Sequence, residues 1–347
     1  MNYSKWKIEE CPTDKLKMFT AAGYPPLLAA MLGVRGIGSV EEAESFLDGG
    51  AELLRDPMLL KDMDKAVERI KSAIARHETV AVYGDYDVDG ISASSLLYLY
   101  LQGLGAKVNT YIPKRKNEGY GLNNEALAAL AEAGTTLLVT VDCGISGVDE
   151  VAAAPAGLEI IITDHHTPPD VLPAAYAIVN PHQRDCRYPF KYLSGVGVAF
   201  KLCQALHQMQ HLTEPLWSEL TELVALGTVA DIVPLRGENR ALVKLGLAAM
   251  ENTGIVGLQK LIEHSGCPQQ NISAENIGFI LAPRLNAVGR LEHAQSAVEL
   301  LVTDDAAKAD MVAEQLNAEN ALRQEISRKI FIEAEAMLAQ QERIETA

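Results

Sequence analysis

The chain has 347 residues, of which 46 are acidic and 30 basic, so its formal net charge is −16. Apolar residues make up 48% of the sequence, and the glycine and proline contents are ordinary for a globular protein. This composition excludes disordered, collagen-like and coiled-coil chains and allows a sizeable core. The negative charge is, at first sight, unfavourable for binding a polyphosphate backbone.

The cysteines and the N-terminus predict a cytoplasmic protein. The five cysteines are widely spaced and form no C-x-x-C motif, so neither a disulfide framework nor a zinc knuckle is expected. The first residues lack the apolar stretch of a secretion signal, and no uninterrupted apolar run approaches ~18 residues. We therefore expect a protein with no membrane partner.

Residues 1–78 predict an N-terminal helical segment. The stretch 26–32 is apolar, and Ser39-Val-Glu-Glu resembles a capping box that opens a helix reaching residue 47. From residue 79 short apolar runs alternate with helical patterns. Strands are expected at 79–83, 107–112, 136–141, 158–163 and 176–179, with helices near 91–104, 123–132 and 146–153.

Nearly apolar strands that alternate with helices predict an α/β fold, a parallel sheet flanked by helices. Within a domain at 79–303, a helical subdomain is expected at 196–303, with helices at 196–209, 215–226, 239–250, 256–264, 274–281 and 294–301. Residues 304–347 contain neither glycine nor proline, and predict one long connecting helix of up to ~60 Å. Either a partner packs on this helix or the natural chain continues into a second domain.

Three carboxylates, those of Asp85, Asp87 and Asp89, occupy alternate positions directly after the first expected strand. Clustered carboxylates are ligands for hard divalent cations, so a metal site is the favoured interpretation. The run resembles an EF-hand loop, but Leu96 stands where that loop requires a bidentate glutamate. The alternative is an acidic turn that caps the following helix.

Two further expected strands end in similar groups. Asp142 follows the third strand, and Asp164, His165 and His166 follow the fourth. The carboxyl ends of parallel strands meet at one edge of a sheet, which is where such folds place their sites. Aspartate oxygens and imidazole nitrogens together suit Mn²⁺ or Mg²⁺ better than structural zinc. Two ions about 3.5–4 Å apart could activate a water for displacement at phosphorus.

Nucleic-acid contacts are expected near the same edge. Lys114 and Arg115 follow the second strand, and Tyr120 stands between glycines, a combination that suits a single strand held by phosphate contacts and base stacking. A solvated basic loop is the alternative. Ser194, Gly195 and Gly197 begin a helix whose backbone N–H groups could bind phosphate.

The motifs GDYDVDG, VDCG, TDHH and GTVADIVPL, in this order, resemble motifs I to IV of the DHH phosphoesterases. The flanking segments IPKRKNEGYG, SGVGVAFKL and APRLNAVGRL are similar to those of the bacterial single-strand-specific 5′→3′ exonucleases within that group. The resemblance extends over residues 27–325. It implies a metal-dependent exonuclease that hydrolyses single-stranded DNA to 5′-mononucleotides in DNA repair and recombination.

The resemblance also implies roles for individual residues. Asp85 would bind one ion and Asp87 the other, Asp142 would bridge both, and His165 with Asp231 would complete the second ion's shell. His166 would contact the scissile phosphate or protonate the leaving group. Asp89 and Asp164 would orient the ligands. The resemblance further implies phosphate contacts from Arg284, Asn286 and Arg290.

Two other functions stay open from the sequence. A DHH-type phosphodiesterase on short oligonucleotides or cyclic dinucleotides would use the same metal ligands, and a non-catalytic replication scaffold would share the fold alone. The exonucleases that the motifs resemble continue into a second domain with a Gly-Gly-His motif, which has no counterpart in these residues.

Overall fold

A computed structural model describes residues 8–114, 118–119, 121–210, 217–289 and 294–339. Within these residues, five parallel strands form one sheet in the order β2-β1-β3-β4-β5. The strands are β1 (Thr79–Gly84), β2 (Lys107–Tyr111), β3 (Thr135–Val141), β4 (Glu159–Thr163) and β5 (Ala177–Val179). The predicted α/β class and the parallel sheet are therefore confirmed.

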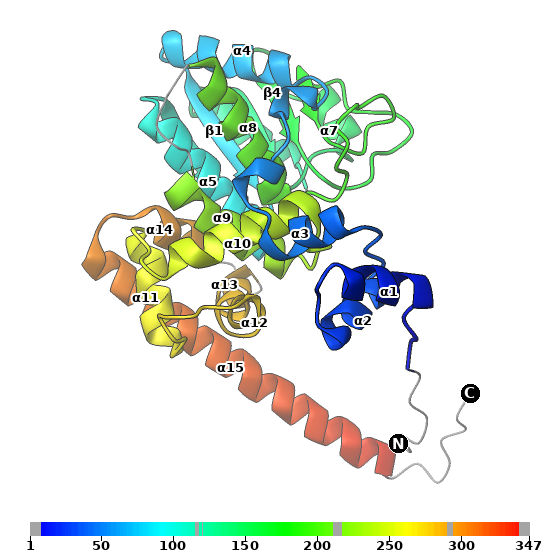
Figure 1. Cartoon of the computed structure of the whole chain (residues 1–347). Helices are drawn as coiled ribbons and strands as arrows, with labels where there is room; N and C mark the ends of the chain where they lie inside the picture. Colours follow the sequence, from blue (N-terminus) through cyan, green and yellow to red (C-terminus); the bar gives the residue numbers. More distant parts are fainter. Residues whose placement is uncertain (1–7, 115–117, 120, 211–216, 290–293, 340–347) are drawn as a thin grey trace.

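The sheet separates two apolar cores because successive residues of a strand point to opposite faces. In β1, Val80 and Val82 belong to the larger core, and Ala81 and Tyr83 belong to the smaller one. On the larger core's side the sheet is covered by α4 (Met63–Ala75), α5 (Val88–Gly103) and α8 (Gly195–Met209), and on the other side by α6 (Asn124–Glu132) and α7 (Val148–Ala152) (Figure 1).

The N-terminal helices form a separate small cluster. Phe19 and Leu32 are buried there, among α1 (Thr13–Ala21), α2 (Pro26–Val34) and α3 (Val40–Asp48). The short helices η1 (Ala51–Leu53) and η2 (Pro57–Leu59) lead from this cluster to α4. The apolar face of α4 belongs to the main core, so the structure differs from the expected boundary at residue 78. The boundary was set by the first strand, whereas the core begins one helix earlier.

The predicted capping box before α3 is half confirmed. The Ser39 side chain accepts the Glu42 N–H at 3.1 Å, as a helix N-cap should. The Glu42 carboxylate, however, accepts the N–H of Gly38 at 2.7 Å rather than that of Ser39. The return hydrogen bond is thus displaced by one residue.

The second half of the structure is helical, as expected. Its helices are α9 (Trp217–Ala230), α10 (Gly237–Met250), α11 (Val256–Ser265), α12 (Ala274–Asn276), the π-helical turn η3 (Ile277–Leu281), α13 (Ala282–Gly289) and α14 (Ala294–Val302). The expected helix at 274–281 continues through the π turn into α13. The APRLNAVG sequence is therefore helical.

A long helix, α15 (Ala306–Ala339), ends the described structure and extends away from the body of the molecule (Figure 1). Its 34 residues correspond to about 50 Å. Ala309, Val312 and Leu316 of its first turns are buried, whereas the later apolar residues Ile326 and Ile330 are exposed. The predicted helix is confirmed as far as residue 339. Across the described residues, none of the helices combines the length and apolarity that a membrane span requires.

Candidate metal centre

The acidic motif after β1 lies where the strand order reverses. After β1 the chain forms β2 on one side of it and then β3 on the other side. Asp85 and Asp87, which follow β1, therefore lie at the topological switch point of the sheet. Asp87 is the N-cap of α5, and its Oδ1 accepts the Gly90 N–H at 3.0 Å. A Cβ at Gly90 would lie 2.5 Å from the Asp85 carbonyl oxygen, so only glycine allows this tight turn.

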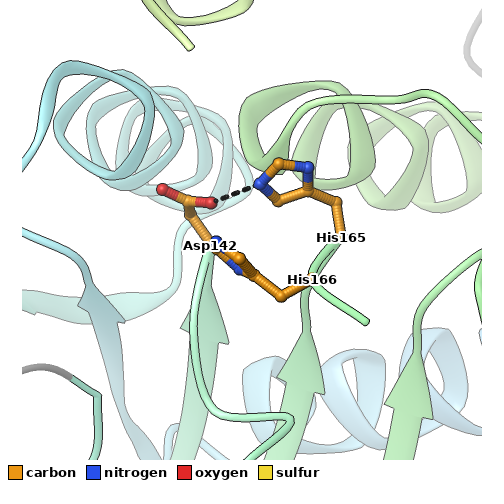
Figure 2. Close-up of side chains that lie close together, drawn as sticks. All are labelled: Asp142, His165 and His166. Atoms are coloured by element: carbon orange, nitrogen blue, oxygen red, sulfur yellow. Dashed lines mark ion pairs between the residues drawn. The ribbon is translucent and has the colours of Figure 1, made fainter. Parts of the chain in front are cut away.

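Asp142 lies directly after β3, beside that turn. It is 2% exposed and has a left-handed backbone with φ of 58°, a conformation that aspartate tolerates better than most residues. Its Oδ1 is 3.1 Å from His165 Nε2, the contact marked in Figure 2. A Cβ at Gly195 would lie 2.4 Å from the Asp142 side chain, so the start of α8 presses closely against this carboxylate.

The turn after β4 holds the histidines. Asp164 Oδ1 accepts the backbone N–H groups of His165 and His166 and lies 2.7 Å from His166 Nδ1, while its Oδ2 accepts the N–H of Ile145 at 2.9 Å. These hydrogen bonds keep the pKa of Asp164 below its usual value despite burial. The hydrogen bond that His166 Nδ1 donates to Asp164 raises the pKa of His166, which favours the imidazolium form.

Two more carboxylates approach His165. Asp89 Oδ2 is 4.0 Å and Asp231 Oδ2 is 3.6 Å from His165 Nε2. Both oxygens of Asp89 also accept N–H groups at the start of α8, from Gly195 at 2.7 Å and Val196 at 2.9 Å. Asp89 therefore joins motif I to α8, and Asp231, at the end of α9, brings the helical half of the chain to the site.

The carboxylates of the cluster carry more negative charge than the protein neutralises. Burial, with the nearby charge of Asp87, raises the pKa of Asp85 to about 7. Burial and the charge of Asp89 raise the pKa of Asp231 to about 6, and the same causes raise that of Asp142. Buried like charges at this density require a counter-charge to remain ionised at neutral pH.

Several ligand atoms also lack hydrogen bonds. Among the described residues, Asp85 Oδ1, Asp142 Oδ1 and His165 Nε2 are buried without a hydrogen-bond partner, since the 3.1 Å contact of the last two is not aligned as a hydrogen bond. Buried polar atoms are normally satisfied. These two carboxylate oxygens and the imidazole nitrogen, which belong to one cluster of possible ligands, are therefore suited to binding cations.

Three sets of side chains offer ligand atoms within 4.8 Å of one another: Asp85, Asp87 and Asp142; Asp142, His165 and His166; and Asp89, His165 and Asp231. Asp142 is shared by two sets and lies between them. Oxygen ligands with one or two imidazoles suit Mn²⁺ or Mg²⁺, and the number of ligands is sufficient for two ions. The structure thus brings together all five residues predicted as ligands, but it groups Asp87 with Asp85 and Asp142, not with His165 and Asp231 as predicted.

The predicted phosphate site at the start of α8 is wrong. Ser194, Gly195 and Gly197 are buried. The Gly195 N–H donates to Asp89 and the Gly197 N–H to the Ser194 side chain, so neither is free for a phosphate. Instead, Gly195 of this G-x-G pattern allows the start of α8 to pack closely against the Asp142 side chain.

The expected phosphate contact of Arg284 stays a prediction, and the structure shows protein partners for this side chain. Its guanidinium donates to Asn317 Oδ1 and to the carbonyl oxygens of Ile280 and Ser265, so it ties α13 to α15 and α11. A sequence pattern cannot distinguish such a bonded arginine from one that faces solvent.

Of the other predicted nucleic-acid contacts, the structure describes Lys114 and Asn286. Lys114 is exposed at the carboxyl edge of the sheet, and Asn286 lines a cleft of about 490 Å³ with Arg323 and Ile232, next to Asp231. Arg115, Tyr120 and Arg290 lie outside the described residues.

One positioning residue was not predicted. Asn180, directly after β5, is fully buried, and its side chain donates to the carbonyl oxygen of His166 at 2.9 Å and accepts the His182 N–H at 2.7 Å. It holds the histidine turn from the neighbouring strand. Its place at the end of a predicted strand was the signal that could have identified it.

Comparison with known proteins agrees with this geometry. The family model described as "DHH family, N-terminal domain" matches residues 79–228. A single-stranded-DNA-specific exonuclease RecJ from Bacillus subtilis is 44% identical over 345 residues, which are 99% of this chain and 43% of that protein. The RecJ of Escherichia coli is 38% identical over 93% of this chain and 57% of its own length.

A solved structure decides the family. A crystal structure of exonuclease RecJ bound to manganese matches with a TM-score of 0.73 and 38% identity over 81% of this chain and 70% of that one. The chain belongs to the RecJ family. The structure of Thermus thermophilus RecJ with Mn²⁺ matches with a TM-score of 0.81 and 35% identity over 95% of this chain, but 47% of its own. The chain thus spans about half the length of the curated RecJ relatives.

Proposed function

We propose that this chain is a two-metal exonuclease that hydrolyses single-stranded DNA from the 5′ end to 5′-mononucleotides, in DNA repair and recombination. The observation that carries the proposal is the set of buried carboxylate and imidazole atoms without hydrogen bonds at the switch point of the sheet. Membership of the RecJ family supports the substrate, because the relatives are named single-stranded-DNA-specific exonucleases. The direction of cleavage rests on this family resemblance.

In this proposal Asp85, Asp87, Asp142, His165 and Asp231 would hold Mn²⁺ or Mg²⁺ ions. Such a pair of cations supplies polarisation of an attacking water and of the phosphate oxygens. RecJ structures with Mn²⁺ and with Mg²⁺ are among the solved structures that this chain matches.

The chain's own residues supply positioning and a proton. Asp164 holds His166 by its Nδ1, and the nearly half-exposed ring could contact the reacting phosphate. The contact with Asp164 raises the pKa of His166, which favours the protonated ring, and this ring could stabilise the phosphate charge or donate a proton to the departing 3′-oxygen. Asp89 fixes the start of α8 behind Asp142.

The DNA strand would run along the carboxyl edge of the sheet. Lys114 lies exposed at this edge, and Asn286 with Arg323 lines the cleft beside Asp231. These groups could contact phosphates and bases of the nucleotides that flank the scissile bond.

The test is nucleotide release from 5′-phosphorylated single strands with Mn²⁺, compared with duplexes and with oligomers of two to five nucleotides. The proposal expects mononucleotides from the single strands, no products from the duplex, and loss of activity with a chelator. Hydrolysis confined to the shortest oligomers would instead support a phosphodiesterase of the wider DHH group. No hydrolysis of any substrate would contradict the proposal.

A further inference from the structure

An arginine-lined cleft lies between the N-terminal cluster and the loop that joins α9 to α10. Two cavities of about 320 and 280 Å³ share the side chains of Arg35, Phe46 and Arg236. Arg55 lines one of these cavities, and Arg240 lines the other. Four arginines around one cleft are unusual in a chain whose net charge is −16.

The positive charge of this cleft is poorly neutralised. Within the described residues, neither Arg35 nor Arg236 forms an ion pair. Arg240 lies over the Phe46 ring at 3.8 Å and donates to the Phe46 carbonyl oxygen. Burial and the charge of Arg35 lower the pKa of Arg240, as expected for like charges held together.

The carboxylates at the cleft do not balance its four arginines. Glu42 lines the cleft, where its carboxylate accepts the Gly38 N–H at 2.7 Å, and its single charge offsets only one arginine. Glu238 lies 3.8 Å from Arg55 and is buried in a 2.6 Å ion pair with Lys201. The cleft therefore has an excess of positive charge that an anionic ligand could neutralise.

The cleft lies near the metal centre along the chain. Arg236 follows Asp231 by five residues, so their Cα atoms are at most ~18 Å apart. Tyr192, two residues before Ser194, is 56% exposed and packs edge-on against Phe190, with ring centroids 5.8 Å apart. Phe190 in turn lies 3.0 Å from the position that a Cβ on Gly237 would occupy. An exposed aromatic ring thus lies next to Phe190, which borders Gly237 in the lining of the arginine cleft.

We infer that Tyr192 and the arginine cleft bind the backbone of the single-stranded nucleic acid outside the metal centre, with a base stacked on Tyr192 and phosphates against Arg35 and Arg236. This inference rests on the proposed function. Arginines interleaved with an exposed aromatic ring suit single-stranded nucleic acid, which offers phosphates and bases in alternation. An acidic peptide would use the arginines but not the ring, and the short distance along the chain from Arg236 to Asp231 favours the substrate strand.

The test is fluorescence anisotropy of labelled dT20 and dT3 with the full chain, in a chelator that prevents hydrolysis, over a series of salt concentrations. In R35Q/R236Q, the affinity for dT20 should fall about tenfold, because two charge-assisted contacts are lost. The slope of log affinity against log salt should become shallower by about 1.4. The loss should be smaller for dT3, which offers fewer phosphates to the arginines than dT20 does.

Two further variants sharpen the result. Y192L should weaken dT20 binding without changing the salt slope, because stacking releases no counterions. R76Q is the matched control, since Arg76 ends α4 at the opposite edge of the sheet and is exposed. It should bind as the wild type does.

An unchanged dT20 affinity and salt slope in R35Q/R236Q would overturn the inference, as would competition by a poly-glutamate peptide more effective than that by unlabelled dT20. Failure of the proposed function is seen separately, as absent nucleotide release with Mn²⁺ from a wild-type chain whose dT20 binding still depends on Arg35 and Arg236.

Discussion

The turns after β3 and β4 each contain one buried aspartate, and the two differ in their hydrogen bonds and in the direction of their pKa shifts. Asp164 receives hydrogen bonds from three backbone N–H groups and contacts the His166 ring, and its pKa is lowered. Asp142 has an oxygen without a hydrogen bond, a left-handed backbone and a raised pKa. Asp164 therefore stabilises the turn, whereas Asp142 needs a positive charge that the protein itself does not supply.

This difference shows that burial of an acid at a sheet edge does not by itself identify a metal ligand. The deciding observation is whether the surrounding amides already fill the carboxylate's hydrogen-bonding capacity. By this criterion we propose Asp85 and Asp142 as ligands, while the hydrogen bonds of Asp164 hold His166 and those of Asp89 hold the start of α8.

The largest expected effect comes from D142N. Asparagine tolerates the left-handed backbone but removes the charge shared by both sets of ligands, so nucleotide release should fall about 10³-fold or more. Because a buried charge is removed, the metal-free variant at pH 8 should unfold at the same temperature as the wild type or higher. Activity is measured by nucleotide release with Mn²⁺ and stability by thermal unfolding with a chelator. Wild-type activity in D142N would contradict the shared role.

D164N should show the opposite balance. An amide cannot accept all the N–H groups that converge on Asp164, so the free energy of unfolding should fall by about 3 kcal/mol. Loss of the contact that orients His166 should reduce hydrolysis by only about 10–100-fold. Denaturant unfolding and nucleotide release are compared with those of D142N. Equal stability losses in the two variants would remove the distinction between a stabilising carboxylate and a ligand.

The pH dependence of metal binding follows from the raised carboxyl pKa values. Asp85, with a folded pKa of about 7 against an ordinary value of 3.8, stays protonated in the metal-free fold at pH 5.5 and is ionised at pH 8. The metal-free protein therefore loses stability as pH rises through 7, since the native state binds more protons than the unfolded one. Mn²⁺ should raise the unfolding temperature by several degrees more at pH 8 than at pH 5.5. A larger shift at pH 5.5 would contradict the origin of these pKa values.

R284Q is expected to have the smallest effect and extends the comparison to arginines. The Arg284 guanidinium is held by three protein oxygens, so its loss should lower the free energy of unfolding by about 1–2 kcal/mol. The salt slope of dT20 binding should not change. A slope reduced by about 0.7 would support Arg284 as a phosphate contact.

Much of the fold and the metal cluster could be predicted from the sequence. The strands are apolar and short, and the edge rule for parallel sheets brings Asp85, Asp142 and His165 together without any knowledge of side-chain geometry. Asp231 needed the family resemblance, because it follows a helix, where that rule does not apply.

The contacts that depend on three-dimensional packing could not be predicted. The N–H groups of Gly195 and Gly197 looked available in the sequence, but Asp89, more than a hundred residues away, and Ser194 accept them. Arg284 resembled a phosphate ligand, and its protein partners could not be seen in the sequence. Conversely, the arginine cleft joins residues from α2 and the α9–α10 loop, which no sequence motif connects.

The most direct test of the central claim is anomalous diffraction at the manganese edge from crystals of this chain soaked in Mn²⁺. The account predicts two peaks that share Asp142, one among Asp85 and Asp87 and the other between His165 and Asp231. No peak at Asp142, or a peak held by Asp164 instead, would contradict the assignment of orphaned carboxylates as the metal ligands.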